Sequence, residues 1–163
     1  MDASQLNELM QITLRSMKEI SSISLQSEVT PLSGRADLPL SVLVGAYVSL
    51  VGREYVLQLG ICSNDHGLKT IAGMMMGMTP EERAALTEDE LADAIGEIGN
   101  MLCGSVKKKL ASKDPTLQIG IPILVRGQVE VSSSIQSAEA DVSIGEVPTR
   151  LVVLHGPKPA SEK

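Results

Sequence analysis

Aromatic side chains are almost absent from this sequence, which has two tyrosines and neither phenylalanine nor tryptophan. Proteins that hold single-stranded nucleic acids stack the bases on aromatic rings, and proteins that bind the phosphate backbone need positive charge. This chain instead has a formal net charge of −6. Both properties argue against a nucleic-acid partner. They also predict an aliphatic core in which methionine side chains fill the gaps.

Cysteine and histidine are scarce as well, with two residues of each. Cys62 and Cys103 lie in apolar surroundings without CxxC spacing, so the sequence predicts two buried thiols in a reducing compartment. His66 and His155 are far apart and belong to no metal-ligand pattern, which argues against a structural zinc site. We therefore expect this chain to supply no metal ligands.

Long hydrophobic runs are also missing. The longest, residues 41–51, is interrupted by Gly45 and is too short to span a bilayer. Residues 1–5 lack the basic segment and apolar run that begin a signal peptide. These absences predict a cytoplasmic protein without a membrane partner.

The hydrophobic pattern predicts one domain with an α+β fold, in which long helices pack on a largely antiparallel sheet. Helices are predicted over residues 2–20, from an N-cap at residues 63–65 to Met76, and over residues 89–113. Strands are predicted over residues 41–51, 54–61, 116–125, 128–135 and 149–154, with a loop at 31–40.

The order of a helix followed by strands occurs twice along the chain. We therefore predict a domain over residues 1–155 with two degenerate halves, about 1–62 and 87–155, and a flexible tail over residues 156–163. The helix of each half carries a related polar pattern. The residues of the two patterns are Ser4, Glu8 and Gln11 in the first half and Asp93, Glu97 and Asn100 in the second.

The second pattern is the most informative feature of the chain. Glu97 and Asn100 are three residues apart, so a helix directs both side chains to one face, and Asp93 lies one turn earlier on that face. A carboxamide can hold a water molecule, and a carboxylate can pair with a cation. The alternative is that both side chains are ordinary residues of a solvated helix face.

Small residues form a second stripe on the same helix. Gly96 and Gly99, with Ala92 and Cys103, lie beside its predicted buried face. Each glycine costs about 1 kcal/mol relative to alanine inside a helix. We therefore expect close packing against a neighbouring backbone to offset this cost.

The spacing Asp93-x3-Glu97-x2-Asn100, followed by Pro122 after twenty-one intervening residues, resembles the signature of the chemotaxis phosphatase family of CheC, CheX and FliY. The resemblance is strongest over residues 89–127. One well-formed motif is more similar to CheX than to CheC, which commonly carries two. In the first half Gln11 stands where asparagine is expected and no glycines flank Glu8. We therefore expect Ser4, Glu8 and Gln11 to be structural or vestigial.

The resemblance implies a CheC-like duplicated fold and a phosphatase that hydrolyses the aspartyl phosphate of a CheY-like receiver domain. It implies that Asn100 positions the water and Glu97 pairs with a lysine of the receiver. No cofactor is expected in this chain, because the partner receiver would bring its own Mg²⁺.

Further residues of the expected site contact the partner rather than act in the chemistry. They are Asp93, Gly96, Gly104 and Pro122. Proteins similar to CheX form dimers through sheet edges, so we expect a homodimer, with residues 128–135 as a candidate edge strand. The alternative to a phosphatase is a non-catalytic module that binds a receiver domain or the flagellar switch.

Overall fold

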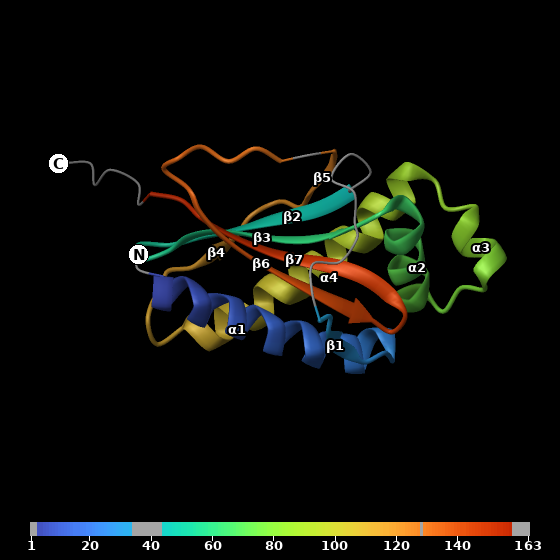
Figure 1. The fold of residues 1–163 in the computed structure, drawn as a ribbon, viewed down its shortest axis with the longest axis horizontal. Coiled ribbons are helices and arrows are strands. Elements are labelled where there is room, and N and C mark those ends of the chain that lie inside the picture. The colour runs from blue at the N-terminus through green and yellow to red at the C-terminus, as the bar shows by residue number, and fades with distance from the viewer. Residues whose placement is uncertain (1–2, 34–43, 128, 158–163) are drawn as a thin grey trace.

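The computed structural model describes residues 3–33, 44–127 and 129–157. Helices and strands alternate in groups along the chain (Figure 1). The elements are α1 (Ala3–Ile20), the short π-helix η1 (Ser21–Leu25), β1 (Val29–Pro31), β2 (Val44–Val51), β3 (Val56–Ser63), α2 (Asp65–Met76), α3 (Pro80–Ala84), α4 (Glu88–Leu110), β4 (Gln118–Ile119), β5 (Ile123–Arg126), β6 (Gln136–Ile144) and β7 (Val147–His155).

The strands form one sheet in which every described pair is antiparallel. Their order across the sheet is β1-β6-β7-β3-β2-β4, and β5 also pairs with β2. β4 pairs with Leu50 and Val51, whereas β5 pairs with residues 44–47, so the two short strands follow each other along the outer edge of β2. The predicted α+β fold with a largely antiparallel sheet is confirmed.

Two long helices cover one face of this sheet. α4 packs on β2 and β3, α1 packs on β6 and β7, and the two helices contact each other (Figure 1). The core between helices and sheet is aliphatic and includes Met10 and Met17, as the composition predicts. A small second cluster, which includes Tyr47 and Cys62, contains residues from β2, β3 and β7.

The predicted helix boundaries are confirmed to within a few residues. The Asn64 side chain accepts a hydrogen bond from the Gly67 backbone N–H at 2.7 Å and begins α2. Gly77 ends α2 with φ of 66°, a left-handed conformation that favours glycine. The predicted strands 41–51 and 54–61 are β2 and β3, although residues 41–43 lie outside the described residues.

The strand predicted over residues 128–135 is wrong. Residues 129–135 contain no strand, and residue 128 lies outside the described residues. Val129 and Val131 alternate with polar residues, but both remain exposed, and the Ile135 N–H donates to the Ser132 carbonyl in a turn. The strand is β6, which follows at Gln136. The expected pairing of this segment between subunits and the homodimer itself both stay predictions.

Other differences have a local cause. The strand predicted over residues 116–125 is split into β4 and β5, since Pro122 has no N–H to donate to a ladder. The sequence reading also missed β1, α3 and η1. Of the predicted tail, residues 158–163 lie outside the described residues, and the Gly156 N–H donates to the Val56 carbonyl at 2.9 Å.

Candidate functional site

Helix α4 is held in one orientation by its ends and by its buried face. At its N-terminus the Thr87 N–H donates to the Glu90 carboxylate at 2.9 Å, and the Glu90 N–H donates to the Thr87 hydroxyl at 3.3 Å, which together form a capping box. The apolar stripe of the helix is fully buried. Its members are Leu91, Ile95, Ile98, Leu102, Val106 and Leu110. The opposite face must therefore point outward.

The predicted polar residues lie on that outward face. Asp93 and Glu97 are exposed, and Asn100 is half-buried. Within the described residues, none of these three side chains makes a hydrogen bond or an ion pair with another part of the chain. A free carboxylate and a free carboxamide, fixed to one face of a rigid helix, are available for another molecule.

Two glycines bring the rest of the fold close to this helix. A Cβ atom on Gly99 would lie 2.7 Å from Val48 Cγ2 of β2, and one on Gly96 would lie 3.2 Å from Pro122 Cβ. The Cys103 thiol, on the same stripe, lies 3.7 Å from the Val48 carbonyl oxygen. The close packing that the small-residue stripe predicts is therefore present, with most of the contact made by side chains rather than by backbone.

The approach of Pro122 creates a groove beside the polar residues. Its volume is about 430 Å³, and its lining residues are Ala46, Ala92, Asp93, Gly96, Glu97, Asn100, Ile121, Pro122, Ile123 and Leu124. The structure thus brings Asp93, Gly96, Glu97, Asn100 and Pro122 together as one surface.

Gly104, the remaining predicted site residue, does not line this groove. It lies one helical turn beyond Asn100, and a Cβ atom placed on it would have open space around it. Its predicted role as a partner contact stays a prediction.

The first-half pattern has a different environment. Glu8 is exposed on α1, but both of its carboxylate oxygens lie 2.8 Å from Lys113 Nζ. Lys113 follows the end of α4, and a second ion pair, between Lys109 and Glu19, joins α4 itself to α1. Among the described residues Glu8 therefore has a partner and Glu97 has none, which agrees with the structural role expected for Glu8.

The sequence reading missed the residues that form the far wall of the groove. Ile121 and Ile123 flank Pro122 and are both exposed. Arg126, at the end of β5, donates to Glu88 at 2.8 Å and to Asp65 at 3.1 Å, and so ties this wall to the start of α4 and α2. The signal was the isoleucine at every second position from 119 to 123.

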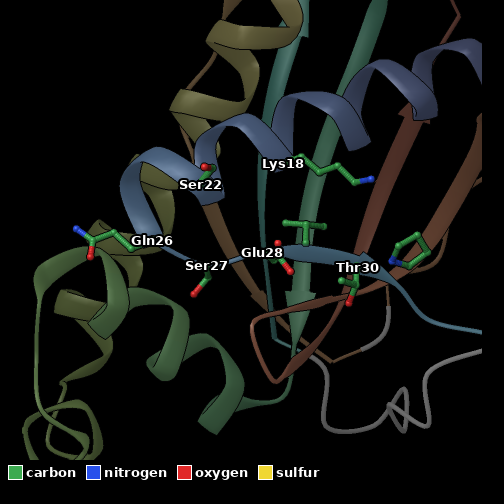
Figure 2. A pocket seen from close by; sticks show the side chains of 8 residues that line it. Lys18, Ser22, Gln26, Ser27, Glu28 and Thr30 are labelled. Atoms are coloured by element: carbon green, nitrogen blue, oxygen red, sulfur yellow. The ribbon is translucent and has the colours of Figure 1, made fainter.

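A larger hollow of about 700 Å³ lies where η1 meets β1. Figure 2 shows that Lys18 and Gln26 point in opposite directions from its two sides, so its polar groups do not converge on one point. It shares no residue with the groove beside α4. It therefore offers no second site of the same kind.

Both cysteines are buried free thiols, as predicted. Burial raises the pKa of the Cys103 thiol to about 12 and also raises the pKa of Cys62. Among the described residues, no three His, Cys, Asp or Glu side chains are grouped so that they could hold a metal ion. No helix in these parts of the chain has the length and apolar character needed to cross a membrane.

Comparison with known proteins identifies the fold and the family. The model of the family described as chemotaxis phosphatase CheX matches residues 44–144. A CheC-like superfamily protein from Shewanella sp. PV-4 superposes with a TM-score of 0.73 at 20% identity, over 96% of this chain and 100% of that one. CheX from Vibrio vulnificus superposes with a TM-score of 0.71 at 20% identity, over 91% and 98% of the two chains.

A third similar structure is the CheX-CheY-BeF3-Mg²⁺ complex from Borrelia burgdorferi. It gives a TM-score of 0.67 at 15% identity, over 90% of this chain and 96% of that one. No curated protein matches the sequence of this chain. The family match covers more than half of the chain, and these structures share its fold. The chain therefore belongs to the CheX family of chemotaxis phosphatases.

Proposed function

We propose that this protein accelerates the hydrolysis of the aspartyl phosphate on a CheY-like receiver domain. The observation that carries the proposal is the pair Glu97 and Asn100, which projects from one face of a buried helix without a partner among the described residues. Membership of a phosphatase family supports the reaction type. The complex of the Borrelia burgdorferi CheX with CheY supports a receiver as the substrate.

In the proposed reaction a water molecule attacks the phosphorus atom of the acyl phosphate. The bond between phosphorus and the aspartate oxygen breaks, which leaves an aspartate carboxylate and inorganic phosphate. This hydrolysis needs a water placed in line with the breaking bond more than it needs a covalent catalyst. Asn100 can both donate and accept hydrogen bonds, so its amide can fix the position and the orientation of that water.

Glu97 has a docking role in this proposal. Its exposed carboxylate would pair with the lysine beside the phosphate on the receiver and so set the position of Asn100. Asp93, one turn earlier, would add negative charge at the edge of the contact. Pro122, which packs on Gly96, would shape the surface that meets the receiver. We expect Mg²⁺ to be supplied with the receiver, which leaves this chain with no metal to bind.

Phosphate release from a phosphorylated receiver, measured with and without the protein, separates this function from the alternative of a non-catalytic binding module. A phosphatase shortens the lifetime of the phosphorylated receiver at substoichiometric concentration, whereas a binding module leaves the lifetime unchanged. Glu97→Ala should weaken complex formation. If Glu97→Ala slowed hydrolysis without weakening the complex, the carboxylate would have a chemical role instead of a docking role.

A further inference from the structure

Three isoleucines near Pro122 keep apolar surface in contact with water along the outer edge of the sheet. Ile121 is 85% exposed, Ile123 is 49% exposed, and Ile119 is 38% exposed. Ile121 and Ile123 line the same groove as Glu97 and Asn100, on its opposite wall. Apolar surface that adjoins free polar groups in this way is typical of a protein–protein contact.

The segment that carries Ile121 is fixed on both sides. The Gly120 N–H donates to the Ser49 carbonyl at 2.8 Å, and Ile123 pairs with Tyr47 in the sheet. Between these two points Pro122 packs against Gly96 of α4. Ile121 is therefore presented outward by a constrained backbone, which reduces the entropy that a binding partner must overcome.

We infer that Ile121 and Ile123 form the apolar docking contact for the phosphorylated receiver domain, an inference that rests on the function proposed above. A receiver whose phosphorylation pocket reaches Glu97 and Asn100 enters this groove and covers both of its walls. An exposed ion pair contributes little affinity by itself. Burial of apolar surface beside Glu97 and Asn100 adds binding affinity that the polar pair does not provide. The central apolar residues of an interface commonly dominate its affinity.

The charge of the groove favours a receiver over a second copy of this chain. The α4 side of the groove carries the carboxylates of Asp93 and Glu97, and none of the described residues that line the groove is basic. A receiver pocket that holds Mg²⁺ and a lysine is complementary to these carboxylates. Two copies of this acidic surface would repel each other.

The receiver for the test is the one, among the receivers of the same genome, whose dephosphorylation the protein accelerates. The test measures binding of this receiver after activation with Mg²⁺ and beryllium fluoride. Binding is measured for the full chain and for Ile121→Ala, Ile123→Ala and Ile23→Ala. Ile23, on η1, is the matched control, because it is 80% exposed and does not line the groove. Ile121 is so exposed that its replacement leaves the fold intact, which thermal unfolding verifies.

We expect Ile121→Ala to weaken receiver binding about tenfold, with a matching rise in KM and an unchanged kcat, and Ile23→Ala to bind as the unchanged protein does. Equal binding by the full chain and by Ile121→Ala would overturn the inference and leave the proposed function intact. Loss of self-association in Ile121→Ala at unchanged receiver affinity would assign the contact to a second copy and also overturn it. Failure of the unchanged protein to dephosphorylate any receiver would refute the proposed function itself.

Discussion

Gly99 of α4 lies against Val48 of β2 so closely that a Cβ atom on Gly99 would be 2.7 Å from Val48 Cγ2. Cβ contacts in proteins are essentially never this short, so a side chain at position 99 would force α4 and β2 apart. The same helix presents Glu97 and Asn100 on its other side. The distance between α4 and the sheet therefore determines where Glu97 and Asn100 lie relative to the other residues of the groove.

Replacement of Gly99 by alanine should destabilise the protein. Overpacking of a core contact costs about 1–3 kcal/mol, which exceeds the roughly 1 kcal/mol that alanine gains over glycine within a helix. Urea unfolding of Gly99→Ala measures the difference. Gly104→Ala is the matched control on the same helix, since a Cβ atom there meets open space and should raise the free energy of unfolding. Equal or greater stability of Gly99→Ala would contradict the close approach of α4 to β2.

Stability should fall in acid through Asp114, which fixes the chain after α4 to the turn between β2 and β3. Burial by itself raises the pKa of its carboxyl group. Hydrogen bonds from the Thr116 hydroxyl and from the N–H groups of Glu54, Thr116 and Tyr55 outweigh burial and lower the pKa to about 2. The ordinary value is 3.8. The Asp114 carboxylate therefore adds to the free energy of unfolding above about pH 4. This contribution is lost as the pH falls towards 2 and the carboxylate is protonated.

Asp114→Asn should lower the free energy of unfolding by about 2 kcal/mol at pH 7. The difference between Asp114→Asn and the unchanged protein should shrink as the pH falls from about 5 to 2, because protonation removes the same charge from the aspartate. Chemical denaturation at a series of pH values measures both quantities. Parallel pH profiles for the two proteins would show that Asp114 does not carry this dependence.

The two glutamates of the paired motifs should separate stability from activity. Glu97→Ala removes a carboxylate without a described partner, so it should reduce receiver dephosphorylation and leave the melting temperature unchanged. Glu8→Ala breaks the contact with Lys113 and should slightly lower the melting temperature, less so at high salt, without an effect on dephosphorylation. Identical losses of activity in both variants would place a second working site on α1.

Both thiols should be unreactive in the folded protein. Burial keeps Cys103 and Cys62 protonated at neutral pH, since it raises the pKa of each, and only a thiolate reacts readily with alkylating reagents. Mass spectrometry after iodoacetamide treatment should find no modification of the native chain and two modifications after unfolding. Rapid native labelling at either position would show that the position is not buried.

Strong local signals made α4 predictable from the sequence. The capping box of Thr87 and Glu90 marks its start, and the apolar spacing from Leu91 to Leu110 identifies its buried face, so the outward direction of Glu97 and Asn100 follows from the sequence. Strand β6 lacks such a signal, because the residues that it packs against the core include the small Ala138 and Ala140. Val129 and Val131 show a clearer alternation, but the structure pairs residues 129–135 with no described strand.

The groove could not be predicted from the sequence for a different reason. Its polar wall lies within one helix, and local spacing describes it fully. Its apolar wall comes from a segment about twenty residues further along the chain, and the meeting of Pro122 with Gly96 depends on how α4 packs across the sheet. The motif spacing placed Pro122 near the site, but only tertiary packing shows that Ile121 and Ile123 remain exposed beside it.

The most direct measurement is the rate of phosphate release from the phosphorylated receiver in the presence of Asn100→Ala, with Gln11→Ala as the matched control on α1. If Asn100 positions the attacking water, Asn100→Ala should lower kcat by about 100-fold while the complex with the activated receiver still forms. Gln11→Ala should keep the full rate. An unchanged rate for Asn100→Ala would show that this amide does not position the attacking water.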